Sequence, residues 1–418
     1  MPHTIAQSVE ILTTVLTIAG MGYFLAAIVA AQAFISARRA PLPPYAPGVS
    51  ILKSLKGLDP AMLDAFRSHC RQTYTGDYEL LFGVSSLDDP AVSAVIRLQL
   101  EFPAHSIQLV HCPQNLGTNG KVSTLIQLAT HARHPYLLIN DSDITVSPRY
   151  LERVMAHFAP SPVSDIPQGA PGPSHLGTGE SIRLPHPVGL VTALYRGRAH
   201  VTLPSRLEAL GIATDFQAGV LLSKMIEGGL HYGLGSTLAV SRQALEKIGG
   251  LTPLVDYLAD DYELGARIAK AGFRVALSAE VVETATPPYT WRAFFDHQLR
   301  WARTVRDARP GGYIGLVFTH SLAWALLNVV ASGISPVSLW LLGLSFFLRL
   351  TLAMMVGAQV LADHQVLPNL WLLPLRDLVA MGVWVAGFAG NTILWRGQRF
   401  TLKDGRLISV VISPDSKT

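Results

Sequence analysis

One acidic stretch, DYLADDYELG at residues 256–265, decides how the rest of this sequence is interpreted. Its aspartates Asp256, Asp260 and Asp261 lie within six residues of one another. Because like charges repel, fold stability alone is a poor reason for this proximity. The stretch follows the apolar run 236–240 and predicts the start of a helix that continues to Ala271, where the helix dipole stabilises carboxylates. We interpret it as a catalytic element held on a rigid helix, with simple charge decoration of a surface helix as the alternative.

The composition indicates a membrane protein. Only 15% of the 418 residues are charged, and the mean hydropathy is +0.32, which is too apolar for an ordinary soluble enzyme. The formal charge is +4, without a run of Lys or Arg, which argues against nucleic acid as a partner. The two cysteines, Cys70 and Cys112, lack the spacing of a zinc site or a disulfide framework, so we expect buried, inert thiols.

Uncharged residues 11–35 predict a transmembrane helix after a short N-terminal tail, 1–10. Arg38 and Arg39 follow it and no Lys or Arg precedes it, so we expect the N-terminus outside and the catalytic domain in the cytoplasm, as in an integral protein of the inner, cytoplasmic membrane. A proline-rich linker, 36–47, comes next. Further membrane segments are expected within 314–395, followed by a C-terminal tail, and the side on which that tail lies stays open. These expected segments are 314–333, 336–361 and 378–394, with the tail at 396–418.

Residues 48–290 alternate short apolar runs with longer amphipathic stretches, which predicts an α/β domain with a mostly parallel sheet flanked by helices. Ligands of such sheets bind at the carboxyl ends of the strands. Residues 160–187 are rich in Pro, Gly and Ser, and we expect a flexible insertion without an assigned role. The predicted strands are 49–52, 79–84, 107–110, 136–139 and 188–192.

Acidic residues follow two of these strands. Asp141 and Asp143 form a D-x-D after the fourth strand, a pattern that suits a divalent cation bridging a diphosphate, such as Mg²⁺ or Mn²⁺. Asp88 and Asp89 follow the second strand. Such residues are also common in turns, so both acidic pairs have a purely structural alternative. Lys121 follows a glycine-rich loop and is a candidate phosphate contact or a solvated lysine.

Residues 291–310 predict an amphipathic helix that combines aromatic residues with arginines at helical spacing, as in helices at a membrane interface. The helix contains His297, Arg300 and Trp301. We expect Arg300 and Trp301 to face the active site as well.

The order of these motifs resembles the membrane-bound, family 2-like glycosyltransferases with a GT-A fold, over residues 48–310. The elements at 88–91, 121–125 and 258–262 are most similar to the ceramide glucosyltransferases, family 21, and their bacterial relatives in hopanoid biosynthesis. The resemblance implies that Asp88 and Asp89 contact the nucleotide and that Asp141 and Asp143 bind the metal and the diphosphate.

By the same resemblance, Asp261 is the general base, and Arg300 with Trp301 ends a (Q/R)-x-x-R-W signature. His297 stands at the first signature position, where Gln or Arg is usual, so a diphosphate contact from that position is less certain. Among the acids of the stretch at 256–265, Asp260 is the second choice for the base and Asp256 the third.

These assignments predict an inverting hexosyltransferase that moves one glucose or N-acetylglucosamine from a UDP-sugar to a hydroxyl of a membrane lipid, either ceramide or a hopanoid. Lys121 or Arg300 and the metal would neutralise the departing diphosphate. A processive polysaccharide synthase is the main alternative, and a catalytically silent membrane scaffold is the third hypothesis.

Overall fold

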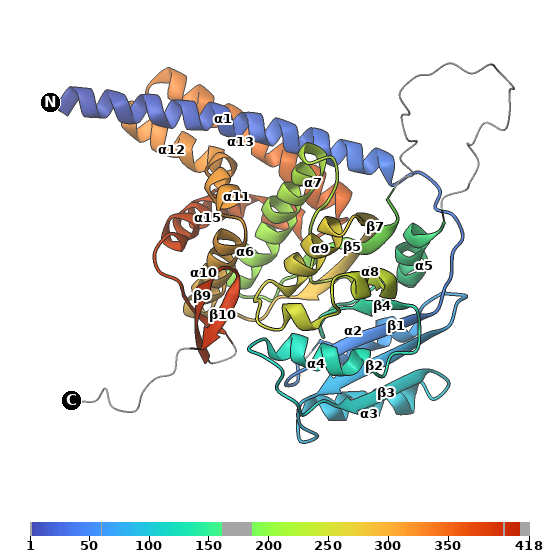
Figure 1. Ribbon diagram of the computed structural model, residues 1–418. Coiled ribbons are helices and arrows are strands. Elements are labelled where there is room, and N and C mark those ends of the chain that lie inside the picture. Colours follow the sequence, from blue (N-terminus) through green and yellow to red (C-terminus); the bar gives the residue numbers. More distant parts are fainter. Residues whose placement is uncertain (1, 60, 161–185, 396–397, 410–418) are drawn as a thin grey trace, which may run out of the picture.

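The computed structural model describes residues 2–59, 61–160, 186–395 and 398–409 (Figure 1). The expected insertion at 160–187 falls almost entirely outside the described residues. A sheet with helices on both faces forms the lower part of the molecule in Figure 1, and long apolar helices lie above it.

The described residues form a seven-stranded sheet in the order β3-β2-β1-β4-β6-β5-β7. Its pairs are parallel except for those of β6, which runs antiparallel to β4 and β5. The predicted mostly parallel α/β fold is therefore confirmed. Five of the strands were predicted in place, whereas β6 and β7 were not recognised as strands. The bounds are β1 (Val49–Leu55), β2 (Tyr78–Val84), β3 (Ser106–His111), β4 (Tyr136–Ile139), β5 (Val188–Arg198), β6 (Leu238–Ser241) and β7 (Arg274–Ala285).

Helices cover both faces of this sheet, which explains why its central strands read as continuous apolar runs. Alternate side chains of a strand enter different cores: Ile51 packs with α2 and α3, whereas Leu52 packs with α4 and α9. The helices of the domain are α2 (Met62–Cys70), α3 (Ala91–Glu101), α4 (Gly120–Ala129), α5 (Tyr150–Met155), α8 (Arg242–Lys247) and α9 (Asp260–Lys270).

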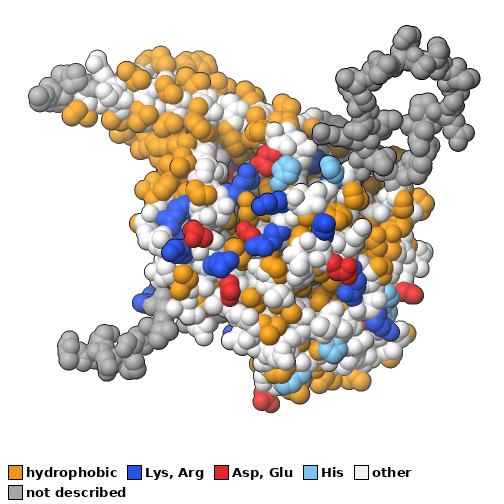
Figure 2. Space-filling view, viewed as in Figure 1, with side chains coloured by type: hydrophobic (Ala, Val, Ile, Leu, Met, Phe, Trp, Pro, Cys, Tyr) orange, Lys and Arg blue, Asp and Glu red, His pale blue; other side chains and the backbone are white. Residues whose placement is uncertain are grey.

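Within the described chain, four helical stretches are long and apolar enough to cross a membrane: Ile5–Ala37, Pro310–Ala331, Pro336–Val360 and Val366–Gly387. One is N-terminal and three are C-terminal, as predicted. The long helix α1 (Pro2–Ala37) packs along α12 (Ser321–Ala331) and α13 (Pro336–Ala353) at the top of Figure 1, where Figure 2 shows mostly hydrophobic side chains. The stretches also include α11 (Pro310–Gly315), α14 (Val366–Asn369) and α15 (Leu373–Gly387), with short 3-10 or π turns at 316–320, 354–360 and 370–372.

Three expected boundaries were wrong. Residues 2–10 belong to α1 and form no separate tail. The last membrane stretch begins at Val366, not at residue 378, and ends at Gly387, not at residue 394, so it includes Arg376 and Asp377. These charges do not interrupt the helix, because Asp377 pairs with the buried Arg349 and Arg376 lies 3.4 Å from Asp215.

A second, three-stranded sheet begins before the expected tail and continues into it, with β8 (Thr392–Trp395), β9 (Gln398–Lys403) and β10 (Arg406–Ser409). The backbone of β10 hydrogen-bonds to the loop before α9, because the Leu407 N–H donates to the Asp256 carbonyl over 2.8 Å. Leu258 packs among apolar residues of this small sheet. The C-terminal strands therefore help to hold the loop that precedes Asp260 and Asp261.

The predicted helix at 291–310 is α10 (Trp291–Ala308). Two of its arginines do not point to lipid headgroups as expected. Arg303 donates to the carbonyls of Ala389 and Thr392, and Arg306 donates to the carbonyls of Gly387 and Gly390. These cations stabilise the carbonyl end of α15 and the turn after it, which is a structural role.

Candidate active site

The acidic stretch divides between a loop and a helix. Asp256 lies in the loop, where its Oδ1 accepts hydrogen bonds of 3.0 Å from the backbone N–H and the hydroxyl of Thr118. The helix α9 starts only at Asp260, so Asp260 and Asp261 occupy its first turn. Asp256 thus stabilises the loop before α4. Asp260 and Asp261 remain as candidates for the catalytic carboxylate.

Lys121 connects these acids to the D-x-D after β4. Asn119 caps α4, since its side chain accepts from the N–H groups of Lys121 and Val122. The Lys121 ammonium lies 2.7 Å from Asp141 Oδ1 and 3.5 Å from Asp260 Oδ2. Burial opposes its charge, but Asp141 and Asp260 outweigh burial and hold the pKa of Lys121 above its ordinary value. The predicted phosphate-contact lysine therefore lies between two of the predicted acidic elements.

Asp141 and Asp143 lie at the carboxyl end of β4, at the edge where parallel strands place ligands. Lys53, a fully buried residue of β1, donates to the Asp141 carbonyl over 2.9 Å and fixes this turn. The Asp143 carboxylate accepts from the Thr284 hydroxyl. Burial, together with the nearby charges of Asp141 and Asp59, raises the pKa of Asp143. A cation would relieve this repulsion.

The donor set of the D-x-D fits a divalent metal that shares its ligands with a substrate. Among the described residues, no group of three or more His, Cys, Asp or Glu side chains is arranged to hold a metal alone. Magnesium commonly takes only one or two carboxylates and completes its shell with water and phosphate oxygens. Asp141 and Asp143 match that pattern, provided that a diphosphate supplies further oxygens.

Asp261 lies close to the D-x-D because the residue between them, Gly235, has no side chain. A Cβ added at Gly235 would lie 2.9 Å from Asp261 Oδ2 and 3.7 Å from Asp141 Oδ2. Burial, and then the charge of Asp260, raises the pKa of Asp261 to about 6. A carboxylate with a pKa nearer neutrality is a better general base than an ordinary aspartate.

Aromatic residues link this acidic cluster to α10. Tyr195 of β5 is buried, and burial together with the charges of Asp261 and Glu208 raises its pKa. The ring of Phe216 lies 5.7 Å from that of Tyr195 and 6.2 Å from that of Trp301. Phe216 thus joins Trp301 of the predicted signature to Tyr195 of the sheet.

A second polar group lies around His297. The Tyr289 hydroxyl is 3.0 Å from His297 Nδ1 and 3.4 Å from Glu208 Oε1, and Arg300 Nη2 is 3.5 Å from the same His297 nitrogen. Burial and the charge of Arg300 lower the pKa of His297 to about 3, so this imidazole is neutral. Its 3.6 Å approach to Glu208 is therefore not an ion pair.

Asp88 and Asp89 lie further along the same sheet edge. Asp88 is exposed, whereas the Asp89 carboxylate accepts from the N–H groups of Gly57 and Ala91, over 2.9 to 3.0 Å. Asp89 therefore joins the loop after β1 to the start of α3. Its described hydrogen bonds do not reach the Asp141 cluster, so its role toward a nucleotide stays a prediction.

Glu208, Tyr195 and Tyr289 were missed by the sequence analysis. Each lies in a segment without a recognisable motif, and tertiary packing brings them to the site. Lys53 carried a signal, because a lysine inside the apolar run of a central strand is costly unless it has a partner. Asp59 also follows a strand, at the position where acids were sought after the second and fourth strands.

A GT-A-like α/β sheet with acidic residues at its carboxyl edge, combined with apolar helices, defines the class as a membrane glycosyltransferase. The family model described as "Glycosyl transferase family 21" matches residues 12–172 and 181–408, and this chain belongs to that family.

The curated relatives are consistent with this assignment. The chain is 25% identical over 378 residues to "Ceramide glucosyltransferase 3" of Caenorhabditis elegans, covering 86% of this chain and 73% of the relative. It is 24% identical over 376 residues to "Ceramide glucosyltransferase 1" of the same organism, covering 87% and 73%.

A solved structure shares the fold. It is a mannosyltransferase from Pyrobaculum calidifontis in complex with GDP-Man and Mn²⁺, with a TM-score of 0.50, 19% identity, and coverage of 91% of this chain and 99% of that one.

Proposed function

We propose that this protein transfers one hexose, glucose or N-acetylglucosamine, from a UDP-sugar to a hydroxyl of a membrane lipid, with ceramide and hopanoids as the acceptor classes. The observation that carries the proposal is the convergence of Asp141, Lys121 and Asp261 at one sheet edge. The names of the curated relatives support a lipid acceptor.

The acidic cluster is the proposed donor site. Asp141 and Asp143 would hold Mg²⁺ or Mn²⁺, which when bound neutralises the diphosphate as it departs. Lys121 supplies a fixed positive charge beside the same position. Asp88 and Asp89 would contact the nucleotide from the loop after β2.

Asp261 is the proposed general base. Its carboxylate accepts the proton of the acceptor hydroxyl while that oxygen attacks the anomeric carbon from the face opposite the departing diphosphate, which inverts the configuration. Asp260 pairs with Lys121 at 3.5 Å and is therefore less able to accept a proton. Arg300 and Trp301 would also face this site, and their contacts with His297 and Phe216 are consistent with that role.

The membrane helices would keep the lipid acceptor in the bilayer, with the catalytic domain on the cytoplasmic side of the inner membrane. This placement follows from Arg38 and Arg39, which come directly after the first span.

Transfer can be tested with the purified full-length protein in lipid nanodiscs containing ceramide or a hopanoid. The assay supplies UDP-glucose or UDP-N-acetylglucosamine with Mn²⁺ and analyses the lipids by mass spectrometry. We expect a single hexose on one lipid. Polymeric sugar would favour the processive synthase, and free sugar without a glycolipid would contradict a lipid acceptor.

A further inference from the structure

Three polar side chains on three different helices, two of them buried and one half-buried, have incomplete hydrogen bonding near the proposed active site. They are Glu208 of α6 (Leu203–Gly211), His297 of α10 and Arg376 of α15. We call them the head-group pocket. Buried polar groups in native proteins normally have partners, so an incomplete set needs an explanation.

Glu208 is only 5% exposed and has no short hydrogen bond to a side chain. Its closest side-chain partners are the Tyr289 hydroxyl at 3.4 Å, Gln298 Nε2 at 3.5 Å and His297 Nε2 at 3.6 Å. His297 Nε2 is itself buried without a hydrogen-bond partner among the described residues. Burial, only partly offset by Arg376 and its other neighbours, raises the pKa of Glu208 to about 7. The carboxyl group therefore accepts or donates a hydrogen bond near neutral pH.

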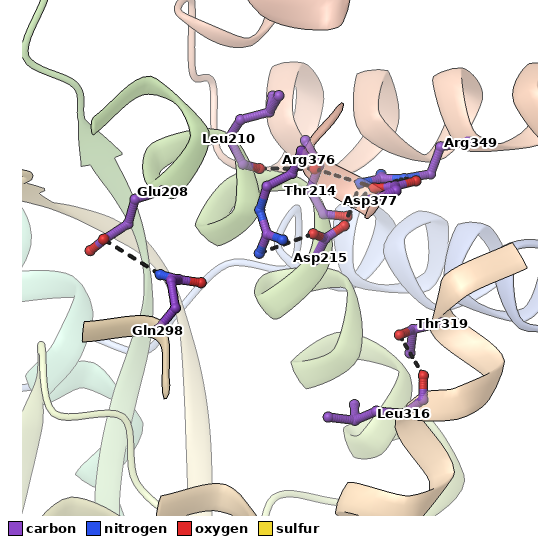
Figure 3. A network of polar contacts seen from close by, with 10 residues as sticks. All are labelled: Glu208, Leu210, Thr214, Asp215, Gln298, Leu316, Thr319, Arg349, Arg376 and Asp377. Atoms are coloured by element: carbon purple, nitrogen blue, oxygen red, sulfur yellow. Dashed lines mark hydrogen bonds and ion pairs between the residues drawn. The ribbon is translucent and has the colours of Figure 1, made fainter. Parts of the chain in front are cut away.

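Arg376 is the third member of the group, and its positive charge acts on the Glu208 carboxyl group. It is 9% exposed, and its Nε and Nη1 have no hydrogen-bond partner within the described part of the chain. Its guanidinium lies across Gly211, where any Cβ would collide with it, and it forms an ion pair with Asp215 at 3.4 Å. Figure 3 shows Arg376 between the Glu208–Gln298 pair and the Arg349–Asp377 pair.

An apolar groove is formed by the two helices that carry His297 and Arg376. It has a volume of about 410 Å³ and lies between α10 and α15. Leu299 of the groove adjoins Gln298 in the chain, and Val379 follows Arg376 by one helical turn. The lining residues, none of them polar, are Phe295, Leu299, Leu378, Val379, Gly382, Val383 and Ala386.

We infer that the head-group pocket and this apolar groove together bind the lipid acceptor, with the polar head at Glu208, His297 and Arg376 and one hydrocarbon chain between α10 and α15. The inference rests on the proposed function and assigns its acceptor site. A polar pocket alone would suit a water-soluble ligand, and an apolar groove alone would suit a hydrocarbon. The two features together therefore suit an amphipathic molecule.

The chemistry of the pocket also defines the head group. Arg376 offers N–H donors, whereas Glu208 offers carboxyl oxygens. An uncharged head with both a carbonyl or hydroxyl acceptor and an N–H or O–H donor satisfies both sides. An amide next to a hydroxyl has this pattern. An anionic phospholipid head would place its charge against Glu208 and is disfavoured.

The test uses the full-length protein in nanodiscs and measures the apparent KM for ceramide and, separately, for the UDP-sugar. Glu208→Gln keeps the shape of the side chain, and Arg376→Lys keeps the charge. Glu246→Gln, at an exposed position of α8, is the matched control. We expect Glu208→Gln to raise the KM for ceramide about 10- to 100-fold, as for a lost hydrogen bond to a charged group, with the KM for the donor unchanged. Arg376→Lys should shift the same constant in the same direction.

A ceramide whose amide is N-methylated sharpens the assignment. The wild type should use it worse than ceramide, and Glu208→Gln should no longer discriminate between the two. Equal increases of both KM values would mean that Glu208 only positions α10, and an unchanged KM for ceramide would mean that no head group binds there. Either result overturns the inference. If the wild type glycosylates no lipid at all, the proposed function itself fails, and the acceptor site fails with it.

Discussion

The acidic cluster and the head-group pocket lie next to each other but differ in how their polar groups are satisfied. Lys121 pairs with both Asp141 and Asp260, and Asp143 has the Thr284 hydroxyl. In the pocket, by contrast, nitrogens of Arg376 and His297 are buried without partners among the described residues. The cluster is organised in advance for a charged donor, whereas the pocket is completed only by a neutral polar ligand.

A neighbouring arginine shows that the helix bundle is able to satisfy a buried guanidinium fully. Arg349 donates to Asp377 over 2.9 Å, to the Thr214 hydroxyl over 3.1 Å, and also to Asp215 (Figure 3). Its role is therefore structural, and it explains why Asp377 lies inside a membrane stretch. Arg376 precedes Asp377 in the chain and lacks such a set, which makes it the better candidate for ligand binding.

The largest expected change in activity comes from replacing Asp261 in the acidic cluster. Asp261→Asn should reduce kcat by roughly 10² to 10⁴-fold, because it removes a general base, while the KM for the UDP-sugar stays nearly unchanged. Initial-rate kinetics check this result. A larger loss of kcat in Asp260→Asn than in Asp261→Asn would show that Asp261 is not the general base.

The next effect concerns the metal. Asp143→Ala should weaken UDP-sugar binding at least about 10-fold when Mn²⁺ is present, because even indirect partners of a metal contribute that much. Calorimetric titration of UDP-sugar with and without EDTA measures it. Activity that survives EDTA unchanged would show that the acidic cluster works without a metal.

A smaller effect is expected from the apolar groove. Phe295 is 40% exposed and lines the groove, whereas Phe294 is fully buried in the core and would destabilise the fold if replaced. Phe295→Ser should raise the KM for a long-chain ceramide about 5-fold, as for roughly 1 kcal/mol of lost apolar contact, and should affect a short-chain ceramide less. Val305→Ser changes an exposed apolar residue of the same helix outside the groove and is the control. An equal effect of Val305→Ser would remove the groove from the acceptor site.

The smallest effect is a pH dependence. Burial and Asp260 raise the pKa of Asp261 to about 6, and a base acts only when ionised. The kcat/KM should therefore be constant at neutral pH, fall to half near pH 6 and decrease further below it. A profile that stays flat down to about pH 4, where an ordinary aspartate titrates, would contradict this environment for Asp261.

The sequence predicted the part of the site that follows from strand ends. The strand 136–139 was placed correctly, and the acids after it lie at the carboxyl edge of the sheet because parallel strands align there. Glu208 could not be found in this way, because a glutamate in an amphipathic helix normally faces water. Only the packing of α6 against α10 buries it.

The same reason explains the wrong membrane boundary. The last segment was expected to begin at residue 378, after the charged Arg376 and Asp377, because their partners Asp215 and Arg349 are far away in the chain. The small C-terminal sheet was also missed, because its strands are only four to six residues long and two of them contain the basic residues Arg399, Lys403 and Arg406.

The most direct test of the division between the two regions is one matrix of initial rates over both substrates, measured for Asp143→Ala and Glu208→Gln in the same nanodisc preparation. The account predicts a crossed pattern, in which Asp143→Ala raises only the KM for the UDP-sugar and Glu208→Gln raises only the KM for the lipid. If both variants raise both constants by similar factors, the two regions form a single undivided site, and the account is contradicted.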